Sequence, residues 1–225
     1  MPTKSAFSIL GLAHKVCLAA EAQGYTPELL NSLAEDKNLF KNLLEVQMGR
    51  AEIKPKVHPW TEENGIIRFS VTSDGTSGKD WIKRLEKKGF NIGDRAKQVL
   101  KSPDFKPTSG TTEIGVLKGK LFSDSDRITA TIRENAKKMG FVKPNAEIAC
   151  LIREKFTDED IEAMGLIWIV AMHEPIKDSG GGPNLLGASR FGGGGWLRAG
   201  WDRPGIGWDD SVGFAFALPQ VKIGA

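Results

Sequence analysis

The segment Leu166-Ile-Trp-Ile-Val-Ala-Met172 decides the fold, because it is an apolar, β-branched run that starts directly after a glycine. A run of about four to eight such residues between turn residues predicts a buried strand. Three further runs of this kind follow it: Leu186–Phe191, Trp196–Trp201 and Val212–Leu218. Four of the six tryptophans also lie in this last third of the chain. We therefore expect a compact β-rich unit at this end.

Helical patterns alternate with strand patterns in the middle of the chain. The predicted helices span residues 78–88, 92–100, 127–139 and 146–156, and the predicted strands span 66–71 and 112–122. The acidic segment 157–164 predicts a surface loop or a short helix. Together these patterns predict an α+β fold with a mainly antiparallel sheet flanked by two helix pairs.

The first fifty residues read as three short helices in succession. Thr26 is a good N-cap for the second of them, and Pro27 fits the first helical position. Two prolines and a polar run then indicate a linker. The predicted organisation is a helical segment over residues 1–50, a linker over 51–65 and an α+β domain over 66–220. Since about fifty residues are marginal for an independent core, the helices either form a small bundle or cover the rest of the chain.

The charge of the 225-residue chain is small but uneven. The net charge is +3, and the segment 61–156 carries 19 basic and 13 acidic side chains, whereas 157–225 carries 5 and 9. Any attraction to a polyanion is therefore expected in the middle segment. With 40% hydrophobic and 26% charged residues, the chain has the composition of a folded globular protein.

The cysteine content and the hydropathy of the chain indicate in which cellular compartment the protein is expected. Cys17 and Cys150 lie far apart within apolar helical patterns, which predicts two buried free thiols in a reducing compartment. We expect a cytoplasmic protein. No run approaches the roughly 18–20 apolar residues of a membrane span, so no membrane partner is expected.

The chain resembles a family of uncharacterised bacterial proteins, known mostly from uncultivated lineages, to which no activity is attached. The residues that carry the resemblance are Trp60, Asp80–Leu85, Gly89–Asp94, Ala96, Ala136, Gly140, Ala146, Glu147, Arg153, Trp168, Glu174–Ile176, Asp178, Ser179, Trp196 and Leu197. Two positions depart from the family pattern. Arg95 stands where tryptophan is usual, and His173 stands where methionine is usual. Both departures argue against a family-wide catalytic task for these side chains.

The segment Met172–Asp178 places a histidine and two carboxylates at the end of a predicted strand, where binding groups are often displayed. Two interpretations stay open: a turn in which Asp178 and Ser179 bond nearby backbone, or a site formed by Glu174 and Asp178. The proline after Glu174 excludes a zinc-binding helix here. The sequence indicates no metal site and no cofactor.

Two further pairs are candidate binding residues. Glu147 and Arg153 are too far apart for a one-turn ion pair, so each is either a surface charge or part of a tertiary contact. In the run from Trp196 to Trp201 side chains alternate between the faces of a strand. We predict that Trp201 is buried and that Trp196 and Arg198 are available to a ligand or partner. The alternative is that the sheet is covered on both faces and that both rings are simply packed.

A basic face is predicted over residues 79–101. Its central charges are Lys83, Arg84, Lys87 and Lys88. The face is either solvated or a weak, sequence-independent nucleic-acid contact. The neighbouring Ser73–Asp80 loop does not fit a phosphate-binding loop, which needs glycine at position 73 and serine or threonine at position 80.

These patterns favour a cytosolic binding or interaction protein without catalysis, whose partner is an unknown protein or a small ligand. One alternative is a nucleic-acid-associated protein that uses the basic face. A third is an enzyme with a carboxylate site at Glu174 and Asp178, which convergence of these groups with Glu147 and Arg153 would favour.

Overall fold

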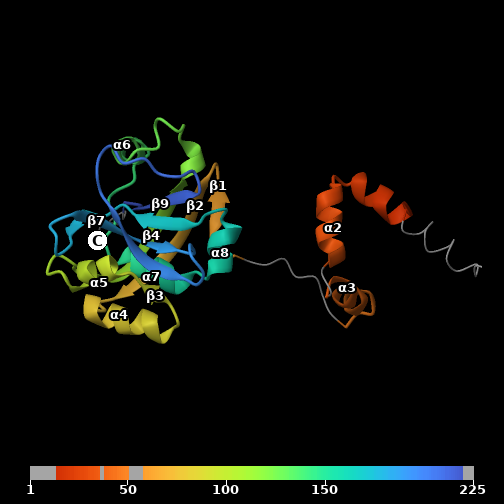
Figure 1. Ribbon diagram of the computed structural model, residues 1–225, viewed down its shortest axis with the longest axis horizontal. Coiled ribbons are helices and arrows are strands. Elements are labelled where there is room, and N and C mark those ends of the chain that lie inside the picture. The colour runs from red at the N-terminus through yellow and green to blue at the C-terminus, as the bar shows by residue number, and fades with distance from the viewer. Residues whose placement is uncertain (1–13, 36–37, 51–57, 220–225) are drawn as a thin grey trace, which may run out of the picture. The chain divides into compact units, whose positions relative to one another are not determined.

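The computed structural model describes residues 14–35, 38–50 and 58–219, and the chain divides into two compact units, residues 1–57 and 58–225 (Figure 1). In the first unit residues 14–21 are helical, followed by α2 (Pro27–Glu35) and α3 (Leu39–Gln47). Residues 51–57 of the expected linker lie outside the described residues.

The second unit is built on one mixed sheet of nine strands within the described residues. The strands are β1 (Thr61–Glu63), β2 (Ile66–Asp74), β3 (Asn91–Ile92), β4 (Ser109–Lys118), β5 (Trp168–Ala171), β6 (Ile176–Lys177), β7 (Pro183–Ser189), β8 (Trp196–Trp201) and β9 (Val212–Ala217). Their order is β1-β2-β4-β9-β5-β7-β8-β3, with β6 paired to β7. The pairs β5–β9 and β3–β8 are parallel and the others are antiparallel. The predicted α+β class is confirmed.

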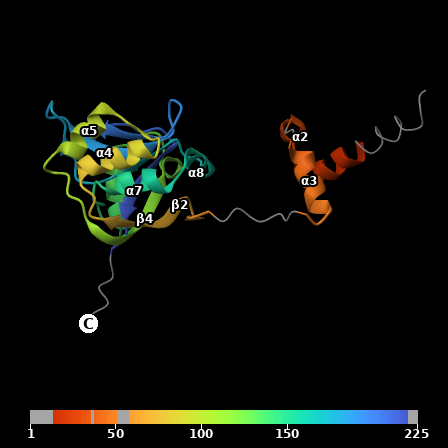
Figure 2. The ribbon, with the colours of Figure 1, turned by 90° about the horizontal axis from the view of Figure 1, so that it is seen from below.

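Helices lie on both faces of this sheet. They are α4 (Gly78–Lys87), α5 (Asp94–Lys101), α6 (Thr129–Lys138), α7 (Ile148–Lys155) and α8 (Asp158–Ala163), with a 3-10 turn at Gly119–Leu121. Figure 2 shows α4, α5 and α7 together on one side of the strands. Residues of α6 belong to a separate hydrophobic cluster with Phe214 and Phe216 of β9.

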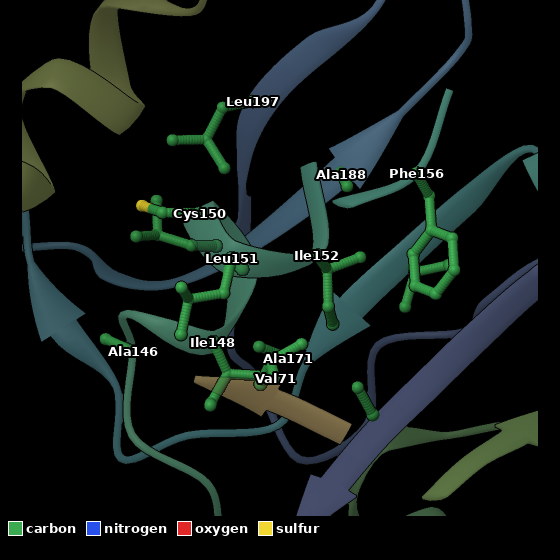
Figure 3. Packing of buried hydrophobic residues seen from close by; sticks show 14 of the residues in the cluster. Val71, Ala146, Ile148, Cys150, Leu151, Ile152, Phe156, Ala171, Ala188 and Leu197 are labelled. Atoms are coloured by element: carbon green, nitrogen blue, oxygen red, sulfur yellow. The ribbon is translucent and has the colours of Figure 1, made fainter. Parts of the chain in front are cut away.

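The strand β9 shows why the central strands are apolar throughout. Phe214 and Phe216 point into the cluster below α6, whereas Ala215 and Ala217 belong to the larger cluster below α4, α5 and α7. Successive side chains point to opposite faces, so a strand covered on both faces must be apolar at every position. Figure 3 shows the larger cluster around α7, where Ile152 and Phe156 are among the side chains that fill it.

Residues 61–65, expected in the linker, instead form a β-hairpin. β1 pairs with β2 so that Glu63 lies opposite Ile66, with Asn64 and Gly65 between them. Both turn residues have positive φ angles, 52° and 74°. An Asn-Gly pair is the strongest short-range signal for such a two-residue turn, and its polarity led to the linker assignment.

Two other expectations need correction. The strand predicted to reach residue 122 ends at Lys118, where a 3-10 turn over Gly119–Leu121 begins. Gly119 fits there because a Cβ atom would lie only 2.8 Å from the carbonyl oxygens of Asp209 and Asp210. Of the two free thiols, Cys150 is buried as expected but Cys17 is exposed.

Candidate functional site

Asp178 organises the loop between β6 and β7. Its Oδ1 accepts hydrogen bonds from the backbone N–H groups of Gly180 and Gly182 at 3.0 and 2.9 Å, and its Oδ2 accepts one from Nδ2 of Asn184 at 3.1 Å. The bond from Asn184 and those from the loop backbone lower the pKa of this carboxyl. The carboxylate therefore serves as the centre of a turn, which is the first of the two interpretations left open by the sequence.

This loop is tied to α5. Oε1 of Gln98 accepts hydrogen bonds from the backbone N–H of Ser179 at 3.1 Å and from its hydroxyl at 2.9 Å. Both bonds are accepted by the amide oxygen of Gln98, so the N–H groups of this amide are its remaining hydrogen-bonding groups, and they are donors.

A pocket of about 430 Å³ lies beside this loop. Its lining comes from α5, from the Asp178 loop and from the end of β8. The side chains that shape it are Arg95, Gln98, Asp178, Ser179, Trp201 and Arg203. Segments more than a hundred positions apart in the chain therefore build one concave surface.

Two arginines flank the tryptophan of this pocket. The guanidinium carbon of Arg203 lies 4.1 Å from the ring centroid of Trp201, and that of Arg95 lies 5.1 Å from it. Guanidinium groups at these distances are attracted by the ring. No carboxylate of the described residues lies within ion-pair distance of either arginine. Within residues 58–219, the arginines that do pair with carboxylates are Arg84, Arg127, Arg133, Arg153 and Arg190.

Glu147, predicted as a binding residue, is fully buried and has a structural role. Its Oε1 accepts from Nε1 of Trp81 at 2.9 Å, and its Oε2 accepts from the hydroxyl of Ser73 at 2.6 Å and from the backbone N–H of Thr108 at 2.8 Å. These bonds join the N-terminal end of α7 to α4, β2 and the chain before β4.

Arg153 is also fully buried. It donates to Asp158 at 2.8 Å and to the backbone carbonyl groups of Ser189 and Phe156, and its guanidinium lies 4.6 Å from the ring centroid of Phe90. Burial lowers its pKa. The side chain links α7 to α8 and β7, and it is closed to any ligand.

Glu174 is exposed and forms an ion pair with Lys143. The hydrogen bond from this lysine lowers the pKa of the carboxyl, so the group is ionised at neutral pH. None of the hydrogen bonds and ion pairs of Glu174, Asp178, Glu147 and Arg153 joins one of them to another. The convergence that would have favoured an enzyme is absent from the described part of the chain.

The prediction for Trp196 and Trp201 is only partly right. Leu197 is buried as expected, but both tryptophans are half-buried. Trp201 lies at the end of β8, where the two arginines rather than apolar side chains cover its ring. Trp196 is covered by Arg198, whose guanidinium carbon lies 4.7 Å from the ring centroid and whose Nη2 donates to the carbonyl of Phe191.

Most of the predicted basic face on α4 is paired. Arg84 binds Asp74 and Glu154 at 2.6 and 2.5 Å, and the same glutamate binds Lys88 at 2.8 Å. Lys83 pairs with Asp80 at 3.1 Å. The positive charge of this helix is therefore largely neutralised by its neighbours, while Lys87 carries no ion pair within the described residues.

His173 is buried and neutral. The backbone N–H of Leu186 donates to its Nε2 at 2.9 Å, so the proton lies on Nδ1, which donates to the carbonyl of Glu174 at 2.6 Å. Burial lowers its pKa to about 4. Burial likewise raises the pKa of Cys150, so neither side chain offers a reactive group to solvent.

Within residues 14–35, 38–50 and 58–219, no three histidine, cysteine, aspartate or glutamate side chains gather in a way that could hold a metal ion. None of the helices described is long and apolar enough to cross a bilayer. Comparison with protein-family models, with curated proteins and with solved structures gives no match. The family resemblance therefore stays a prediction.

Sequence reasoning found Asp178 but missed Arg95, Gln98 and Arg203. These side chains meet only in the folded chain, because α5, the loop after β6 and the end of β8 line the same pocket. One signal was present in the sequence: Arg203 is one of few basic residues in the acidic last segment.

Proposed function

We propose that the protein is a non-catalytic binding protein that holds an anionic ligand in the pocket between Arg95, Trp201 and Arg203. The observation that carries this proposal is the presence of two guanidinium groups at one pocket, neither of which lies within ion-pair distance of a carboxylate among the described residues. The charge of Arg95 also acts on the pocket carboxylate Asp178, whose pKa it helps to lower. Guanidinium groups present several donors in a plane that matches a carboxylate or phosphate. The amide donors of Gln98 add to this excess of donors over acceptors.

Binding is better supported than catalysis at this place. The oxygens of Asp178 already accept bonds from its own loop, and Glu174 is paired with Lys143. Neither carboxylate has the raised pKa that a general acid needs near neutral pH. The alternative of nucleic-acid binding also loses support. It needs free positive charges on α4, and most of these charges are paired with carboxylates.

A cytoplasmic location is part of this proposal, since both cysteines are free thiols. The pocket also depends on Arg95, which departs from the pattern of the bacterial family that the chain resembles. The anion site is therefore proposed for this chain and not for that family as a whole.

The test is a titration of the full chain with inorganic phosphate and, separately, with the dicarboxylate glutarate, followed by tryptophan fluorescence and calorimetry at low ionic strength. We expect saturable binding of at least one of the two, and a loss of affinity of about tenfold or more in Arg95→Gln and Arg203→Gln, since each removes a charge-assisted hydrogen bond. Arg68→Gln is the matched control, because Arg68 is exposed, contacts Phe141 and lines no part of this pocket. An equal loss in the control, or no saturable binding of either anion, would overturn the proposal.

A further inference from the structure

The pocket beside the Asp178 loop is lined by charges of both signs. Among its lining side chains, Arg95 and Arg203 are positive and Asp178 is negative. A ligand that carries only negative charge is attracted by the two guanidinium groups and repelled by the carboxylate. The full complement of this pocket is therefore a ligand with two anionic groups and one cationic group.

The carboxylate of Asp178 can accept more than its loop donates. It accepts two hydrogen bonds at Oδ1, from Gly180 and Gly182, and one at Oδ2, from Asn184. An ionised carboxylate offers about four lone-pair sites, so one site remains on Oδ2. A single remaining acceptor suits an ammonium group, which is a compact cation with donors only, better than the two-pronged fork of a guanidinium group.

Asp178 and Arg95 act on each other without touching. The pKa of Asp178 is lowered first by its hydrogen bonds with Asn184 and the loop, and further by the charge of Arg95. No ion pair joins the two side chains, so a gap separates these opposite charges, and water or ligand groups fill a gap of this kind. The matching ligand places a carboxylate beside Arg95 and an ammonium group beside Asp178. Both groups are attached to one carbon atom in an α-amino acid.

Arg203 is then left for a second anionic group. Its guanidinium carbon lies 4.1 Å from the ring centroid of Trp201, and that of Arg95 lies 5.1 Å from the same centroid. The indole is therefore close to both cations and offers an apolar surface to the carbon atoms that join two carboxylates.

We propose that the ligand of this pocket is an acidic α-amino acid of the size of glutamate, an inference that rests on the proposed function. Its α-carboxylate binds Arg95, its ammonium group binds Asp178, and its side-chain carboxylate binds Arg203. The pocket volume of about 430 Å³ falls within the range of small-molecule sites.

The experiment is a calorimetric titration of the full chain with L-glutamate and with analogues that each lack one charged group. Glutamine lacks the side-chain carboxylate, glutarate lacks the ammonium group, and 4-aminobutyrate lacks the α-carboxylate. We expect glutamate to bind at least about tenfold more tightly than each analogue, because each has lost one charge-assisted contact.

Two variants assign the groups of the ligand to side chains. Arg203→Gln should weaken the binding of glutamate about tenfold and leave that of glutamine unchanged. Asp178→Asn should weaken the binding of glutamate and not that of glutarate. A folding defect lowers the affinity for all ligands alike, so these differences between ligands report the contacts themselves. Asp104→Asn is the matched control, because Asp104 is exposed and lines no part of this pocket.

Binding of glutarate or phosphate as tight as that of glutamate would overturn this inference and leave the proposed anion pocket in place. Absence of binding by every anion would overturn both. Equal losses for all ligands in both variants, or a loss in the control, would also overturn the assignment. If Asp178→Asn does not fold, the analogue series on the original chain decides by itself.

Discussion

Nε1 of Trp81 donates a hydrogen bond to Oε1 of Glu147 over 2.9 Å, and both side chains are entirely buried. The bond connects α4 to the start of α7, two helices that share one face of the sheet. A buried carboxylate is costly unless its lone pairs are used, and the hydroxyl of Ser73 and the backbone of Thr108 occupy the other oxygen. The indole N–H is therefore one of the donors that together satisfy both oxygens of the Glu147 carboxylate.

We predict that Glu147→Gln destabilises the protein by about 2–3 kcal/mol, because a glutamine must turn its amide N–H toward either Trp81 or Thr108, both of which are donors. Trp81→Phe removes the indole N–H that donates to Oε1 of Glu147. The double variant should therefore lose less stability than the sum of the two single variants, as measured by denaturant unfolding. Strict additivity would show that the indole N–H and the carboxylate are not coupled.

His173 should make stability depend on pH. Its pKa is about 4 in the folded chain and its ordinary value is 6.5, so the unfolded chain binds more protons between these values. The neutral, buried His173 therefore contributes about 3 kcal/mol to the free energy of unfolding above about pH 6.5. This contribution is lost as the pH falls from 6.5 toward 4. The free energy of unfolding of His173→Gln should change less between pH 6.5 and 4. Parallel pH profiles for the two proteins would contradict this assignment.

Gly78 begins α4, and we predict that Gly78→Ala costs about 3 kcal/mol or more, as strong overpacking does. A Cβ atom at this position would lie 1.9 Å from the carbonyl oxygen of Leu100, which is backbone and cannot rotate away. Gly205→Ala is the control, because a Cβ atom there would have no other atom within 4 Å. Thermal unfolding of both variants decides the matter: similar melting temperatures would mean that α4 and α5 separate easily.

The two tryptophans of β8 should differ in binding and not in stability. Both are half-buried, so Trp196→Ala and Trp201→Ala should each cost less than the roughly 3–5 kcal/mol of a core aromatic. Trp201 contacts both pocket arginines, so its loss should weaken anion binding, whereas Trp196→Ala should leave it unchanged. Stability is followed by denaturant unfolding and affinity by calorimetry; equal affinity losses would place the anion elsewhere.

The fold was largely predictable because its elements follow local patterns. The run Trp196–Trp201 matches β8 at both ends, and the helix predicted to start after Ser77 does so, with the hydroxyl of Ser77 accepting from the backbone N–H of Asp80. The short strands β3 and β6 were missed. Each has two residues and owes its conformation to a neighbouring strand, so no periodicity is available to reveal it.

The candidate site was much less predictable. A charged side chain looks the same in the sequence whether it is paired, buried or free. Arg84 is ion-paired and partly exposed, Arg153 is ion-paired and fully buried, and Arg95 forms no ion pair within the described residues. These differences depend on neighbours from distant segments. Local patterns carry no record of such neighbours, so the sequence predicts binding roles for Glu147 and Arg153 and places Arg95 only within the basic face.

The position of β9 in the sheet has a consequence for how the protein is made. β9 is the last of the described strands, yet it lies between β4 and β5 near the middle of the sheet. Before residues 212–217 leave the ribosome, the earlier strands can hydrogen-bond only as two groups, β1-β2-β4 and β5-β7-β8-β3 with β6 on β7, each with an unpaired edge where β9 will lie. The nascent chain must therefore wait for β9 to emerge before the two halves join, and during that interval both edges are open to pairing with other chains.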